Sequence, residues 1–107
     1  MALVDVGHGT NACDGTEQTL DTETAAKTYV LMLDLNGLAN GQTVVVRLKT
    51  RVLTGGTTRT IYRADYANVQ TTQPIVVSAP VPSLFELIAT IEGTNTVSVP
   101  WVLMTID

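Results

Sequence analysis

The sequence predicts an all-β fold: an antiparallel two-sheet β-sandwich or small barrel, jelly-roll or Ig-like, of about seven strands with an extended N-terminal arm. The first observation is composition, because 18 Thr and 14 Val among 107 residues supply β-branched side chains that favour a pleated sheet. The second is a series of segments in which apolar and polar residues alternate, as in strands buried on one side. Gly, Asn and Pro lie between these segments and mark turns. A chain of this length has room for one core.

The N-terminal segment has the weakest strand pattern. Gly7, Gly9 and Gly15 interrupt it, and its apolar residues show little periodicity. We therefore expect an N-terminal arm over residues 1–18, followed by a single β-sandwich domain over residues 19–107. The segment EQTLDTE, which crosses this boundary, is a candidate further strand.

The segment TYVLMLDL, residues 28–35, has the clearest strand pattern. Its aromatic and leucine side chains fall on one face, which is predicted to be buried. The NGLANGQ stretch that follows contains Asn-Gly twice, and both residue types tolerate a positive φ, so the chain is expected to reverse there. The predicted buried face holds Tyr29, Leu31, Leu33 and Leu35.

Residues 46–66 are predicted to form a hairpin with a three-residue loop at residues 55–57. A two-residue loop would move arginines onto the apolar face, because a one-residue slip exchanges the two faces. The predicted register pairs Val46 with Tyr66, Val52 with Thr60, and Arg47 with Asp65. The basic face then collects Arg47, Lys49, Arg51, Arg59 and Arg63.

Residues 85–103 are predicted to form a second hairpin, with a loop at residues 93–95. Pro100 cannot donate a ladder hydrogen bond, so its strand is expected to lie at an edge or to carry a bulge. Between the two hairpins, Pro80 and Pro82 favour an extended stretch and a short strand. The predicted register pairs Ile91 with Val97, Ala89 with Val99, Leu87 with Trp101 and Phe85 with Leu103.

Charge is segregated along a chain whose net charge is −4. Residues 1–26 hold five acids and no base, whereas residues 27–63 hold all six bases. An acidic chain binds phosphates poorly, which disfavours nucleic acid as a partner. We hypothesise that the acidic segment contacts the basic face of a neighbouring copy or of another protein, although a solvated basic face is the competing interpretation. The candidate partner-binding residues are Asp5, Asp14, Glu17, Arg47, Lys49, Arg51 and Arg63.

The residues do not indicate catalysis or a bound cofactor. His8 and Cys13 are the chain's only soft metal ligands, fewer than a structural zinc site needs. No serine lies in a nucleophile-elbow motif, and the lone cysteine cannot form an internal disulfide. No signal peptide or membrane-spanning segment is predicted. We therefore expect a non-enzymatic protein without metal, cofactor, small-molecule substrate or membrane partner, with a calcium site in the acidic arm left open.

Three motifs resemble small β-sandwich virion structural proteins of tailed bacteriophages. They lie within residues 28–103: the turn with Asp34, Leu35, Leu38 and Gly41, the Pro-Val-Pro at 80–82, and the Pro-Trp at 100–101. The resemblance implies a capsid decoration or cement protein that bridges subunits of the major capsid protein or copies of itself. It implies a place on the capsid surface after synthesis in the host cytoplasm.

Two other roles remain open. A tail or head-tail connector subunit is the first alternative that the resemblance allows. A carbohydrate-binding module ranks third, because few of the aromatic side chains are expected to be exposed.

Overall fold

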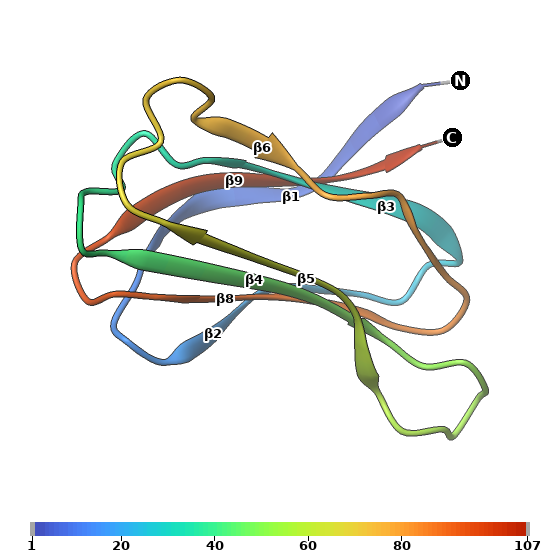
Figure 1. Cartoon of the computed structure of the whole chain (residues 1–107). Helices are drawn as coiled ribbons and strands as arrows, with labels where there is room; N and C mark the ends of the chain where they lie inside the picture. Colours follow the sequence, from blue (N-terminus) through green and yellow to red (C-terminus); the bar gives the residue numbers. More distant parts are fainter. Residues whose placement is uncertain (1, 107) are drawn as a thin grey trace.

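The structure, a computed structural model, describes residues 2–106. Within that range it contains nine strands and no helix (Figure 1). The strands form two antiparallel sheets that face each other as a sandwich, which confirms the predicted fold class. Their bounds are β1 Leu3–Ala12, β2 Glu17–Glu23, β3 Lys27–Asp34, β4 Thr43–Thr50, β5 Arg59–Ala67, β6 Ile75–Val77, β7 Val81–Ser83, β8 Leu87–Gly93 and β9 Ser98–Ile106.

The strand order is that of a jelly roll. The first sheet has the order β1-β9-β3-β6, with β7 also paired to β3, and the second has the order β2-β8-β4-β5. β6 and β7 pair with opposite ends of β3, so they act as the two halves of one interrupted strand. The first strand then pairs with the last, β2 with β8, β3 with β6 and β7, and β4 with β5. This pairing is that of one long hairpin wound into two sheets. Of the two predicted strand orders, the structure therefore has that of a jelly roll and not the Ig-like one.

The core lies between the inward faces of the two sheets. Tyr29, Leu31 and Leu33 are buried on β3, as the alternation predicted, and the Tyr29 hydroxyl donates a hydrogen bond of 2.7 Å to the Ala25 carbonyl. Each fully buried aliphatic side chain stabilises the fold by about 1.5–3 kcal/mol. The second sheet supplies Val44, Val46, Leu48, Leu87, Ala89 and Ile91 to the same core.

The predicted C-terminal hairpin is wrong. β8 and β9 lie in different sheets, and residues 94–97 cross from one sheet to the other. Leu87, Ile91 and Leu103 are buried as expected, but they meet across the core instead of side by side. Alternation shows which side chains point inward, and it gives the same pattern for neighbouring strands and for strands that face each other.

Pro100 also lies in an unexpected place. Its strand, β9, is central in the first sheet, between β1 and β3. The β3–β9 ladder ends at the pair Leu33–Trp101, one residue before Pro100, which is matched only with Thr10 of β1. Pro100 therefore lies where β9 has a single neighbouring strand. At that position β9 behaves as an edge strand, in which a proline is tolerated.

The predicted hairpin of β4 and β5 is present, but its register is shifted. Val46 lies opposite Ala64, and Arg47 opposite Arg63, with an irregularity between Leu48 and Lys49. The loop spans residues 51–58 and is longer than expected. From Val46 to Leu48 the shift is two residues, an even number that keeps these side chains on their predicted faces. Beyond Leu48 the shift is three residues, and Arg51 and Val52 lie in the loop and not in the strand.

Much of the segment expected to be an arm is a strand. β1 pairs with β9 along its length, and the register shifts between Asp5 and Gly7. Gly7 and Gly9 lie against the indole of Trp101, and a side chain at Gly7 would also collide with the carboxylate of Asp21. Glycines and a shifted register hide the period of two, so the segment resembled a loop. The candidate strand EQTLDTE is confirmed as β2, and Met1 lies outside the described residues.

We expect Gly93→Ala to destabilise the protein by about 1–3 kcal/mol. A Cβ at this position would lie 2.5 Å from Cys13 Sγ and 2.9 Å from Cys13 Cβ, both of which are buried. The matched control is Gly9→Ala, whose Cβ would meet Trp101 at an ordinary 3.5 Å. Denaturant unfolding should show the loss only for Gly93→Ala, and equal effects of the two substitutions would contradict this packing.

Candidate functional site

The outer face of the second sheet carries a network of ion pairs. Lys49 Nζ on β4 lies 2.8 Å from Glu17 Oε2 on β2, across the intervening strand β8. Arg47 Nη1 lies 3.1 Å from Glu92 Oε1 on β8 and 3.7 Å from Glu17 Oε2. The buried hydroxyl of Thr90 donates a hydrogen bond of 2.6 Å to Glu17 from beneath the network. Three of the predicted partner-binding residues are therefore joined within one chain.

This network changes the electrostatics of the predicted basic face. The pKa of Glu17 lies below its usual value, mainly because Lys49 and Thr90 hydrogen-bond its carboxylate. The side chains of Arg47 and Lys49 are largely covered, with exposed fractions of 19% and 27%. Cations held in this way attract a polyanion less than free cations would.

Arg63 and Asp65 form a separate, exposed pair on β5. Arg63 Nε lies 2.9 Å from Asp65 Oδ1, and Nη2 lies 3.1 Å from Oδ2. The hydrogen bonds from Arg63 lower the pKa of Asp65. Because both side chains are exposed, they remain accessible for an outside contact. An exposed pair of this kind contributes little to stability.

Asp5 and Asp14 lie apart from the basic residues. Asp5 is on β1 in the first sheet, where its Oδ2 is 2.8 Å from His8 Nδ1. Asp14 accepts hydrogen bonds from the backbone amide and the hydroxyl of Thr16, which lower its pKa and hold the turn before β2. The structure therefore does not bring these two acids onto the basic face of the same chain.

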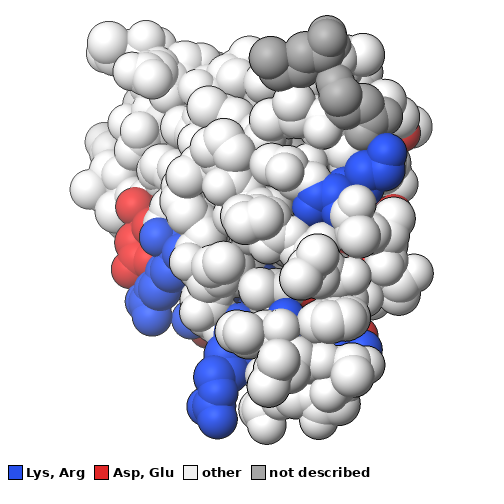
Figure 2. Space-filling model, turned by 90° about the vertical axis from the view of Figure 1, so that its right-hand side faces the viewer, with Lys and Arg blue, Asp and Glu red and all other residues white. Residues whose placement is uncertain are grey.

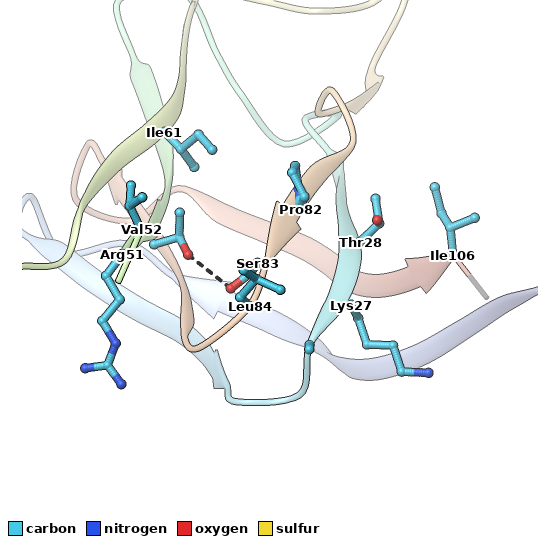
Figure 3. A pocket seen from close by; sticks show the side chains of 11 residues that line it. Lys27, Thr28, Arg51, Val52, Ile61, Pro82, Ser83, Leu84 and Ile106 are labelled. Atoms are coloured by element: carbon cyan, nitrogen blue, oxygen red, sulfur yellow. Dashed lines mark hydrogen bonds between the residues drawn. The ribbon is translucent and has the colours of Figure 1, made fainter. Parts of the chain in front are cut away.

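The seventh predicted residue, Arg51, lines a cleft of about 680 Å³ at one end of the sandwich (Figure 3). Apolar side chains form most of its wall, and the hydroxyls of Thr50 and Ser83 meet there at 3.0 Å. The hairpin register had placed Val52 on a buried face, but it lies in the loop with 84% of its surface exposed. The apolar wall is made of Val52, Ile61, Pro82, Leu84 and Ile106.

Sequence reasoning missed this cleft, because its residues come from five separate segments of the chain. No periodic pattern links positions so far apart. The one available signal was the pair of apolar residues Val52 and Leu53 beside a Gly-Gly turn, which fits an exposed apolar loop.

An acidic pair on β2 was also missed. Burial raises the pKa of Glu23, and the hydrogen bond and charge of Asp21 raise it further. Burial and these two carboxylates raise the pKa of Tyr29 as well. The register of β2 shifts between Thr19 and Asp21. Asp21 and Glu23 therefore do not follow the simple alternation, and the sequence did not reveal the pair.

The candidate nucleophile and metal ligands are not assembled. Cys13 is buried and its burial raises its pKa, whereas His8 is exposed on β1. Within residues 2–106, no group of three His, Cys, Asp or Glu side chains is placed to hold a metal ion. The same part of the chain contains no helix long and apolar enough to span a membrane.

No family model matches the chain, and no curated protein matches it. Two solved chains are similar to it, in structures of infectious bursal disease virus, strains Gt and Gx. The TM-scores are 0.53 and 0.52, each at 12% identity over 98% of this chain. This chain spans about a third of the length of those chains, 32% and 31% respectively. The likeness shows a shared fold, and neither of these two matches is a tailed-phage protein.

We expect Glu17→Gln to destabilise the protein at neutral pH by less than about 1 kcal/mol, as for other partly exposed ion pairs. The folded-state pKa of Glu17 is lowered, so its contribution is present above the unfolded-state pKa and is lost as pH falls through the folded-state value. The free energy of unfolding should therefore fall less steeply toward acid in the variant. An unchanged acid limb would contradict a role for the network in stability.

Glu23→Gln should have the opposite effect. The folded-state pKa of Glu23 is raised, so its stabilising contribution is complete below the unfolded-state pKa and is lost as pH rises through the folded-state value. The glutamine keeps an uncharged group beside Asp21, so the variant should be more stable than the parent at neutral pH. Parallel denaturant titrations from acid to neutral pH would measure this, and a neutral-pH loss of stability would contradict it.

Proposed function

We propose that the chain is a non-enzymatic structural component of a virus particle. The observation that carries this proposal is the jelly-roll order of the two sheets, together with the likeness of nearly the whole chain to chains in the infectious bursal disease virus structures. Jelly rolls are used widely in viral capsid domains, where the loops and faces of a rigid sandwich make the contacts. Fold alone does not fix function, so the proposal depends on a location that experiment can test.

Within that class, we propose a decoration or cement protein of a tailed phage that bridges subunits of the major capsid protein. The first of the motifs behind the resemblance, the turn after β3, stabilises the fold. Leu35 and Leu38 are buried in the turn after β3, Asp34 Oδ1 accepts a hydrogen bond from the amide of Asn36, and Gly41 has φ +86°. A small rigid protein repeated over a shell binds tightly through individually weak contacts, because neighbouring sites raise the effective concentration.

The exposed charged groups supply contacts for this role. Asp5, Asp14 and Arg63 are accessible, whereas Glu17, Arg47 and Lys49 are largely satisfied within the chain. Carbohydrate binding is less well supported, because Tyr29 is fully buried and the indole of Trp101 is partly covered by Gly7 and Gly9.

Quantitative mass spectrometry and electron microscopy of purified particles would test this role. We expect hundreds of copies on the shell, and lower heat resistance in particles that lack the protein. A small fixed copy number at one vertex or along a tail would favour the connector or tail role instead. Absence from particles would overturn the structural virion role altogether.

A further inference from the structure

The cleft lies between two strands at the open flank of the sandwich. β5 is the edge of the second sheet and pairs only with β4, and β7 pairs only with β3, among the strands of residues 2–106. Ile61 of β5 and Pro82 of β7 stand on either side of the gap (Figure 3). The two sheets are tied together deeper in, where Thr50 and Ser83 both donate hydrogen bonds to the Glu86 carbonyl, at 2.7 and 2.9 Å. The flank is therefore held in shape but left uncovered.

An apolar surface surrounds this opening. Ile61 is 49% exposed and Leu84 is 67% exposed, and the loop beside them presents Val52 and Leu53. Figure 2 shows this end of the molecule, where uncharged residues fill most of the surface and Lys and Arg lie toward the margins. Exposed aliphatic side chains that gather around a concave surface mark a contact site more often than an ordinary solvated surface.

The two charged residues among the described residues that line the cleft are both basic. Lys27 and Arg51 line it, and none of the described lining residues is acidic. Arg51 Nε is buried and has no hydrogen-bond partner within the described chain. A carboxylate from outside would pair with the charged guanidinium group of Arg51 through charge-assisted hydrogen bonds.

We propose that this cleft binds an extended segment of a partner protein, with aliphatic side chains at alternate positions and a carboxylate that reaches Arg51. The outer edge of β5 offers main-chain groups to an added strand, and the alternate side chains of that strand would enter the apolar cleft. A second copy docked by the same end is disfavoured, since it would bring Arg51 of one copy close to Arg51 of the other. This inference rests on the geometry of the flank alone, independently of the role in a virus particle.

Selection from a random peptide display library on the immobilised whole chain would test the binding preference without prior choice of sequence. We expect enrichment of peptides with alternating aliphatic residues and at least one Asp or Glu. In amide NMR titrations, the enriched peptide should shift the signals of Ile61, Leu84 and residues 51–53. Enrichment of basic or pattern-free peptides, no enrichment, or shifts on another face would each overturn the proposal.

Two variants and a matched control identify the contacts. Arg51→Gln should weaken the enriched peptide about tenfold or more, because it removes a charge-assisted hydrogen bond. Ile61→Asp should abolish binding by placing an acid at the cleft, and unchanged amide spectra elsewhere would show that it folds. Arg63→Gln removes an arginine charge from β5, the strand of Ile61, at a position that does not line the cleft, and this variant should bind as the parent does. Equal affinity of all variants, or concentration-dependent dimers that Ile61→Asp dissociates, would overturn the assignment.

Discussion

The two C-terminal strands hold both sheets together, and the rest of the structure depends on this arrangement. β9 pairs with β1 and β3 in one sheet, while β8 pairs with β2 and β4 in the other. They face each other across the core, where Leu103 of β9 and Leu87 and Ile91 of β8 are fully buried. Neither sheet is complete until strands from opposite ends of the chain have met. Such long-range pairing makes folding slow and cooperative, because loop entropy is lost before most of the contacts form.

The same winding leaves the two flanks of the sandwich different. On one flank, residues 13–16 connect β1 to β2, and Cys13 N donates a hydrogen bond of 2.8 Å to the Val97 carbonyl. On the other flank, the strand that would cover β3 is interrupted at residues 78–80. Ser78 satisfies the backbone of Leu31 in that gap, since its hydroxyl accepts from Leu31 N at 3.0 Å and its amide donates to Leu31 O at 2.8 Å. The hydrogen bonding of β3 is therefore completed without a continuous edge strand, and the cleft lies beside β7, the second half of the interrupted strand.

Sequence patterns predicted the faces of the strands more reliably than their partners. The period of two located the buried side of β3 and the sidedness of β4 and β5, because burial depends on each strand alone. Pairing depends on loop geometry and on which sheet a strand joins, and neither leaves a local signal at Gly93 or in residues 51–58. β1 was hidden by its glycines, whose role is close packing on Trp101. The cleft was unpredictable for a related reason, because Lys27, Ile61 and Leu84 become neighbours only when both sheets have formed.

Charge and apolar surface therefore have different uses in this molecule. The most conspicuous feature of the sequence, its run of basic residues on β4, is used largely within the chain. On the outer face of the second sheet, Arg47 and Lys49 join three strands through Glu17 and Glu92. A network that is already neutralised has little free energy left for a partner, since an incoming group must displace an existing one. Arg51 follows the same strand but lies beyond the reach of that network, with an unpartnered donor and an apolar wall beside it. Recognition through this residue is selective because apolar fit and charge must be satisfied together, and neither alone supplies much affinity.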